Sequence, residues 1–416
     1  MKPRAYSSPP LPTLEHTSFK TSVKLDPVPV TPVDVFLAGS CNPTTWRRDV
    51  AVPMLEVAGV KYYNPQRDEW YEALVQEEAK AQAGAKILLM VIDSVTRAIV
   101  CINETVEYIC RNRRVILVVQ DVKPGTTIEG QVISPAEVTE LNAARAYLRR
   151  LARDRGVPLC EDVHAAVQAT IRSVERENPR RQSPQISRLR RRTSIVLDDI
   201  ARSYRPPQSR HRSWTSTSLL ATLGHSGDAN DWETCDTLVR HAGYLAPRKR
   251  GKYLHVEGNL QSTAWQRSGV LPRLQRAGIP FSISHDDYVS FDHPRLAYRE
   301  TTFDDKRWTV AEAERAEASL VLFVVPTRTR SIATMAEAVA LICSRHHALL
   351  LVIEPLAEGS TLDDREKLVG RDFKDLSRAR VYLRELAKRF DVEVFQSVHE
   401  AADSLIDRVC HRSLRR

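Results

Sequence analysis

The sequence predicts an α/β protein of two flavodoxin-like, doubly wound domains, each with a five-stranded parallel sheet, joined by a disordered linker. Apolar runs of strand length alternate with helical patterns of about 10–20 residues, which is typical of parallel sheets with right-handed crossovers. The pattern occurs twice in 416 residues, a length that suits two domains of roughly 150 residues. Between the two occurrences the composition shifts to Arg, Ser, Pro and Gln.

These shifts in composition place the boundaries of the predicted parts. A disordered arm rich in Pro and Ser covers residues 1–32, and the first domain covers 33–176. The linker covers 177–250, and the second domain covers 251–411.

The first domain is predicted to contain five strands, in chain order Val33–Ala38, Val60–Tyr63, Ile87–Ile92, Arg114–Gln120 and Val157–Cys160. The spacing of apolar residues predicts five helices, at Trp46–Ala58, at Trp70–Gly84, around Glu104, at Pro135–Arg155 and at Val163–Val174. Ligands of such sheets bind at the carboxyl ends of the strands. We therefore expect Gly39–Thr45, Asn64–Trp70 and Asp93–Arg97 to surround one crevice.

Three collinear blocks indicate that the second domain is a duplicate of the first. Gly39 and Trp46 recur 219 residues later as Gly258 and Trp265. Two further blocks recur at nearly constant offsets of 233 and 235, with the matches Arg97/Arg330, Glu104/Glu337 and 141–152/376–387. Such collinearity is typical of a tandem repeat.

Composition excludes several classes of protein. The formal charge is +9, but segment 179–213 holds ten Arg and two Asp without Lys or Glu. The positive charge therefore belongs to the linker, which argues against nucleic-acid binding by a folded domain. No apolar run of about 18 residues or secretory leader occurs. The seven cysteines lack a CxxC pair, so we expect a cytoplasmic protein without a disulfide framework, zinc or cofactor.

Four motifs of the first domain, GSCNPTTWRRD, YYNPQ, VID…TRA…E and LNAARAYL, resemble the nucleoside 2-deoxyribosyltransferase-like family. The resemblance covers 33–175 well and 252–410 more loosely. It implies a hydrolase or transferase that cleaves the N-glycosidic bond of a nucleoside or nucleotide. In this chemistry a glutamate attacks C1′ of the sugar and the base departs. The glutamate corresponds to Glu104, and Asp93 is the nearest acid or base-orienting group.

Both carboxylates have structural interpretations as well. Glu104 is also consistent with a solvated helix residue, and Asp93 with an N-cap of the following helix. The family usually places an acid closer before the nucleophile, where this chain has Ala98. Family enzymes often complete their site with a neighbouring subunit, so a homodimer or an internal pseudo-dimer of the two repeats is expected.

The segment that follows the first strand supplies further candidates for substrate binding. Gly39, Ser40 and Asn42 precede a helix N-terminus, an arrangement that favours phosphate or sugar hydroxyls. Arg47 either binds a 5′-phosphate or is a solvated residue of the first turn. Trp46 is a further candidate, although its recurrence favours packing.

Two candidates come from the other strand ends. Asn64 either binds sugar hydroxyls or forms an Asx turn before Pro65. Arg97 either contacts a ligand or forms a structural ion pair. Cys41 is disfavoured as a nucleophile, because no His accompanies it.

The second domain has lost part of this pattern. Asp93 corresponds to Pro326, Asn42 to Gln261 and Arg47 to Gln266. We therefore expect the second copy to be degenerate, inactive, and structural or regulatory.

The linker contains a pattern read by basophilic protein kinases. Arg190–Arg192 precede Thr193 and Ser194, and a phosphate there would offset the positive charge. An alternative function is therefore a non-catalytic nucleotide sensor or scaffold that is regulated by linker phosphorylation.

Overall fold

The computed structural model describes residues 33–66, 73–177, 254–258, 270–283, 315, 318–344, 348–362 and 366–413. The expected arm and nearly all of the expected linker, with Thr193 and Ser194, lie outside these ranges. No helix within them is long and apolar enough to cross a membrane. The same residues contain no group of three or more His, Cys, Asp or Glu placed to hold a metal ion.

The first half of the chain forms a five-stranded sheet in the order β2-β1-β3-β4-β7, and every neighbouring pair is parallel. All six residues of the central strand β3 are buried, as expected for a strand covered on both faces. The strand bounds are β1 Val35–Gly39, β2 Tyr62–Tyr63, β3 Ile87–Ile92, β4 Val115–Val119 and β7 Leu159–Cys160. The α/β class and these five strands agree with the sequence prediction.

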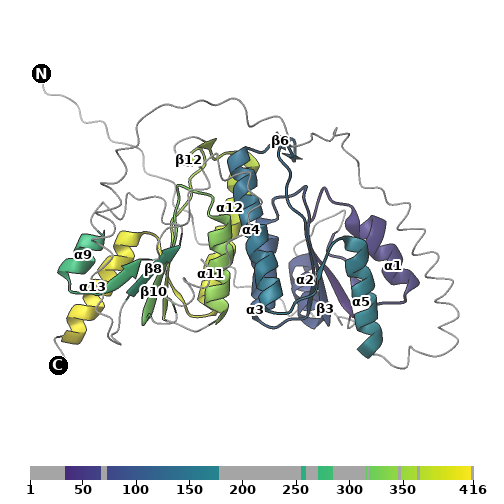
Figure 1. Ribbon diagram of the computed structural model, residues 1–416, viewed down its shortest axis with the longest axis horizontal. Helices are drawn as coiled ribbons and strands as arrows, with labels where there is room; N and C mark the ends of the chain where they lie inside the picture. Colours follow the sequence, from purple (N-terminus) through teal and green to yellow (C-terminus); the bar gives the residue numbers. More distant parts are fainter. Residues whose placement is uncertain are drawn as a thin grey trace, which may run out of the picture.

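Helices cover both faces of this sheet (Figure 1). Successive side chains of β1 point to opposite faces of the sheet. Val35 and Leu37 pack with residues of α1 and α5 on one face. Phe36 and Ala38 pack with residues of α3 and α4 on the other face. A hairpin of β5 and β6 before α4 was not predicted. The bounds are η1 Arg47–Ala51, α1 Val52–Val57, α2 Ala73–Gly84, α3 Ile99–Cys110, β5 Thr127–Ile128, β6 Gln131–Val132, α4 Pro135–Asp154 and α5 Val163–Glu177.

The second half forms another parallel sheet, in the order β14-β11-β10-β8-β9. Read from its other end, this is the strand order of the first sheet. A duplication of the chain stays a prediction. The bounds are β8 Leu254–Gly258, α9 Val270–Arg276, β9 Phe281–Ile283, β10 Leu320–Val325, α11 Ile332–Ser344, β11 Leu349–Ile353, β12 Thr361–Leu362, β13 Glu366–Lys367, α12 Gly370–Arg389, β14 Glu393–Phe395 and α13 Val398–Ser413.

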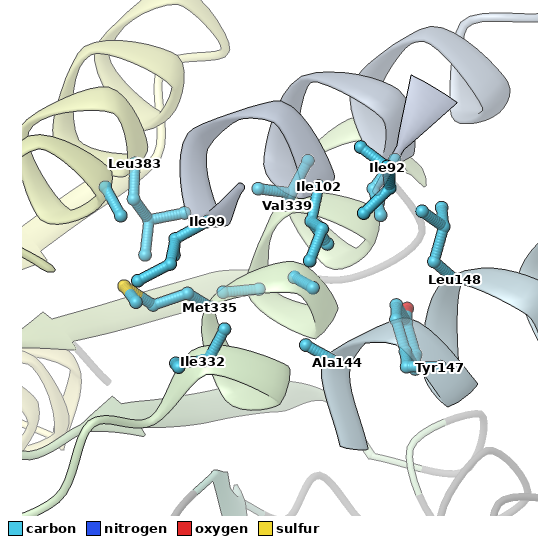
Figure 2. Packing of buried hydrophobic residues seen from close by; sticks show 14 of the residues in the cluster. Ile92, Ile99, Ile102, Ala144, Tyr147, Leu148, Ile332, Met335, Val339 and Leu383 are labelled. Atoms are coloured by element: carbon cyan, nitrogen blue, oxygen red, sulfur yellow. The ribbon is translucent and has the colours of Figure 1, made fainter. Parts of the chain in front are cut away.

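The two halves pack against each other through their inner helices. Helix α3 contacts α11 and α12, and helix α4 contacts α11; one hydrophobic cluster includes residues of both sheets and all four helices (Figure 1). Figure 2 shows Ile99 and Ile102 of α3 beside Met335 and Val339 of α11. Each half therefore supplies the cover that the inner face of the other half requires.

Charged groups are also buried between the halves. Arg97 Nε lies 2.6 Å from Glu137 of its own half and 3.8 Å from Asp372 of the other half. Arg330, the equivalent of Arg97, lies 3.0 Å from Asp372 and 3.7 Å from Glu137. These four side chains are at most 5% exposed. We refer to Arg97, Glu137, Arg330 and Asp372 as the interface ion cluster.

Glycine ends the first strand of each sheet because β1 and β3, like β8 and β10, approach closely there. Gly39 has a φ of +99°, and a Cβ at this position would lie 2.2 Å from the Val91 carbonyl oxygen. Gly258 has a φ of +114° and the same separation from the Val324 carbonyl oxygen. Both positions therefore exclude side chains.

We expect Gly39→Ala to lower the free energy of unfolding by about 3 kcal/mol, because it adds a backbone clash to an unfavourable φ. Gly59→Ala is the matched control, since Gly59 has a φ of +64° but no atom lies within 4 Å of the position that its Cβ would take. The control should cost about 1–2 kcal/mol. Urea unfolding measures both, and equal losses would contradict the close approach.

We expect Arg330→Met to lower the free energy of unfolding by about 3–5 kcal/mol, because buried carboxylates lose their counter-charge. Arg371→Met is the control. Arg371 also links the halves through Glu129, at 3.2 Å, but its side chain is 44% exposed, so its loss should cost less than about 1 kcal/mol. Similar effects of the two variants in chemical denaturation would contradict a dominant role for the interface ion cluster.

Candidate functional site

The loops at the carboxyl ends of β1, β2 and β3 contact one another in the first half. The Ser40 hydroxyl accepts a hydrogen bond from the Asp93 backbone N–H at 3.1 Å, and its oxygen lies 2.8 Å from Thr96 Oγ1. Gln66 Nε2 donates to Asn42 Oδ1 at 2.5 Å and to the Thr44 carbonyl at 3.3 Å. Ser40 and Gln66 therefore join the three loops that the sequence placed together.

Asp93 is buried at the centre of these loops. Its Oδ1 accepts the Val95 N–H at 3.1 Å and lies 2.8 Å from Thr96 Oγ1. Its Oδ2 is buried and has no hydrogen-bond partner among the described residues. Burial raises the pKa of Asp93, against the lowering effect of the Thr96 and Val95 hydrogen bonds. One carboxylate oxygen thus shapes the loop, and the other is buried beside it without such a contact.

The interpretation of Asp93 as a helix N-cap is wrong. Helix α3 begins at Ile99, and its N-cap is Ala98, which has a left-handed φ of 53° and no capping side chain. Ser331, the equivalent of Ala98, has a φ of 54°. The backbone turn before the helix is therefore common to both halves.

Glu104 lies on α3 and is partly buried. Burial raises its pKa to about 7, with added contributions from the negative charges of Glu107 and Glu78. Glu78 of α2 therefore acts electrostatically on Glu104. Sequence reasoning missed Glu78, and the only signal was the Glu-rich composition of its helix.

Two thiols lie in the same electrostatic environment. The pKa of Cys41 is raised by desolvation, against the lowering effect of Arg47, and also by the charges of Glu104 and Glu78. Burial, followed by the charge of Glu104, raises the pKa of Cys101. Both sulfurs are therefore protonated at neutral pH, which disfavours a thiolate nucleophile.

Arg47 and Trp46 point into the protein and hold the end of β1. Arg47 is fully buried, and its guanidinium donates to the carbonyls of Leu37 at 3.0 Å, Ser40 at 2.6 Å and Gly39 at 3.2 Å. The interpretation of Arg47 as a solvated residue is therefore wrong. Trp46 is buried, and its Nε1 donates to the Ser40 carbonyl at 3.2 Å.

The two remaining candidates make local or inter-half contacts. Asn64 Oδ1 accepts the Gln66 N–H at 3.0 Å, which is the Asx turn that its position before Pro65 suggested. Arg97 joins the interface ion cluster and also donates to Gln131 at 3.2 Å. Neither contact involves Glu104.

These residues lie in a segment that can be compared with known proteins. Residues 32–122 match the model of a family described as nucleoside 2-deoxyribosyltransferase like. The matched segment contains Ser40, Asp93 and Glu104 and ends before α4. No curated protein matches the chain. The family resemblance that the motifs suggested is thus confirmed for the segment that carries the candidate site.

A buried arginine outside the matched segment supports the site. Arg145 of α4 donates to the carbonyls of Asp93 at 3.0 Å, Thr96 at 2.8 Å and Gln120 at 3.0 Å. Arg380 of α12 similarly donates to the carbonyls of Pro326 and Thr329. Sequence reasoning missed this role, although the two arginines align at the offset of 235.

The equivalent region of the second half has different electrostatics. Glu337 is 2% exposed, and its Oε1 lies 3.2 Å from Arg315 Nη2. Arg315 Nε lies 3.2 Å from Glu257, which takes the position of Ala38. Burial lowers the pKa of the neighbouring His255 to about 4. Glu337 therefore faces a cation, whereas Glu104 faces carboxylates.

We expect Glu104→Gln to stabilise the protein above pH 7. The pKa of Glu104 is raised from 4.5 to about 7, so its contribution to wild-type stability is full below pH 4.5, falls as pH rises from 4.5 to about 7, and is lost above that pH. The variant does not undergo this loss. The unfolding free energy of Glu104→Gln minus that of the wild type should be about 2–3 kcal/mol larger at pH 8 than at pH 5. Urea unfolding at both pH values measures it, and a constant difference would contradict the raised pKa.

Proposed function

We propose that the first half of the chain transfers or hydrolyses the glycosyl group of a nucleoside, with Glu104 as the nucleophile. The main support is the position of Glu104 in the segment that matches the family. The carboxyl groups of Glu107 and Glu78 also act on Glu104 electrostatically. The Glu104 carboxylate attacks C1′, the C1′–N bond breaks, and its electron pair stays on the base. Water or a second base then attacks C1′ and releases Glu104.

The departing base requires a proton, and two carboxyl groups can supply it. Asp93 has a raised pKa and a buried oxygen without a hydrogen-bond partner among the described residues. Glu78 acts electrostatically on Glu104 from α2. Near pH 7 a raised pKa suits proton transfer. Asp93→Asn and Glu78→Gln distinguish the two, because loss of the proton donor should affect substrates with poor leaving bases most.

The contacts of Arg47 favour nucleosides over 5′-monophosphates as substrates. Its guanidinium donates to three backbone carbonyls at the end of β1. A 5′-phosphate would have to displace these hydrogen bonds to reach it, which leaves buried carbonyls unpaired. We therefore infer that Gly39, Ser40 and Asn42 bind sugar hydroxyls and that Arg47 holds their loop.

The two similar halves suggest a pair of related flavodoxin-like units, of which the second is inactive. The pairing of Glu337 with Arg315 neutralises the carboxylate that corresponds to the nucleophile. This observation also supports the alternative function, a nucleoside-sensing scaffold, because the same frame carries a different charge arrangement there. Phosphorylation of Ser194 or Thr193 would then regulate it.

The deciding experiment incubates the full chain with nucleosides and their 5′-monophosphates, and measures free base by chromatography. We expect base release from at least one nucleoside and a loss of at least about a hundredfold in Glu104→Gln, since the nucleophile is removed.

Glu337→Gln is the matched control and should retain activity, because Glu337 lies in the second half. No release from any substrate, with a nucleoside still raising the melting temperature, would favour the sensor. Release that persists in Glu104→Gln would exclude Glu104 as nucleophile.

A further inference from the structure

Glu107 connects the candidate site to the second half of the chain. It lies on α3, three residues after Glu104, and its side chain is 4% exposed. We propose that the second half takes part in the candidate site through Glu107, a positioning residue whose carboxylate Tyr382 and Arg389 hold beside Glu104. This inference rests on the proposed function of Glu104.

The Glu107 carboxylate receives contacts from both halves. The Tyr382 hydroxyl donates to Oε2, and Arg389 Nη2 donates to the same oxygen at 3.0 Å. Arg111 Nη1 of α3 donates to Oε1 at 2.8 Å. Both carboxylate oxygens are thus engaged, and the contacts from α12 fix the carboxylate against the inner face of α3.

Glu104 and Glu107 are neighbours on the helix surface, because residues three apart in a helix share a face. The surroundings of each are therefore part of one environment. The titratable groups that act on or respond to Glu104 are Glu107, Tyr108 and Cys101 of α3, Glu78 of α2, Cys41 after β1 and Tyr382 of α12. Those around Glu107 are Arg111 and Tyr108 of α3, Tyr382 and Arg389 of α12, and Cys343 of α11.

The contacts from α12 keep Glu107 ionised. Burial acts against ionisation, but the hydrogen bonds of Tyr382 and Arg111 and the charge of Arg389 lower the pKa of Glu107. The negative charge of Glu107 in turn contributes to the raised pKa of Glu104. Burial and the charges of Glu107 and Glu104 raise the pKa of Tyr382, so its hydroxyl keeps the proton that it donates.

This arrangement occurs on one side of the interface only. At the offsets of 233 and 235, Glu107 corresponds to Ala340, Tyr382 to Tyr147, and Arg389 to Asp154. If these contacts only joined the two halves, we would expect equivalent contacts at the corresponding positions of the second half. Glu107 and Arg389 occur in the half where they act on Glu104. Glu337 pairs with Arg315, whereas Glu104 makes no such ion pair with any arginine that the structure describes.

The experiment measures the titration of Glu104 without requiring turnover. The difference in unfolding free energy between wild type and Glu104→Gln, followed by urea unfolding from pH 4 to 9, changes between the unfolded-state and folded-state pKa of Glu104 and levels off above the latter. The pH at which the difference levels off reports the folded-state pKa, and we refer to it as the midpoint of Glu104 titration. The same comparison is made in a Glu107→Gln background. We expect the midpoint to fall from about 7 by about one pH unit, because a neighbouring negative charge is lost. Where turnover exists, kcat/KM at pH 6 should rise about fivefold relative to its high-pH plateau.

Tyr382→Phe provides a second variant that removes the hydroxyl and keeps the charge. It should lower the midpoint of Glu104 by a smaller amount than Glu107→Gln does. Without the Tyr382 hydrogen bond the pKa of Glu107 is higher, so Glu107 carries less negative charge. This variant decides the question if Glu107→Gln does not fold. Arg371→Gln is the control, since it removes an exposed link between the halves, and should leave the midpoint unchanged.

The outcomes separate this inference from the proposed function. An unchanged midpoint in Glu107→Gln and Tyr382→Phe, with equal loss of stability at every pH, would show that the contact only joins the halves and would overturn the inference. A lowered midpoint without turnover of any nucleoside would support the inference and refute the enzyme.

Discussion

The association of the inner helices is the interaction on which the rest of the structure depends. Buried residues of α3 and α4 pack against those of α11 and α12 in a cluster that includes both sheets. Separation of the halves would expose side chains such as Ile102 and Met335, each of which contributes about 1.5–3 kcal/mol on burial. The apolar packing therefore drives association. The interface ion cluster favours one relative orientation of the two halves, because few other orientations would keep its buried charges paired.

The interface also determines the geometry of the candidate site. Arg97 ends the loop that begins at Asp93, and its guanidinium is held by Glu137 and faces Asp372. Arg145 binds the carbonyls of Asp93 and Thr96 from α4, a helix of the same interface. The loop is thus fixed at both ends by inner helices. A change in how the halves pack would reach Asp93 through two buried arginines.

Local pattern was sufficient to predict the five strands of the first sheet and the helices around it, since apolar periodicity reports burial directly. It gave β3 with its observed bounds and α4 to within one residue. It missed the β5–β6 hairpin, which has only two residues in each strand. The burial of Arg47 was also beyond local pattern, because its partners are carbonyls at the end of a strand seven to ten residues earlier. Glu78 and Glu107 acquire their importance from helices that meet only in the folded chain.

The comparison of the two halves explains why a shared frame does not imply shared chemistry. Gly39 and Gly258 and the arginines Arg145 and Arg380 make equivalent backbone contacts. Strand position 38 carries Ala in one half, and its equivalent carries Glu257 in the other, where Arg315 bridges Glu257 to Glu337. A carboxylate paired with a buried arginine is held ionised and neutralised. A carboxylate beside other carboxylates exchanges its proton near neutral pH, as Glu104 does, and this second arrangement is the one that accompanies the nucleophilic role proposed for Glu104.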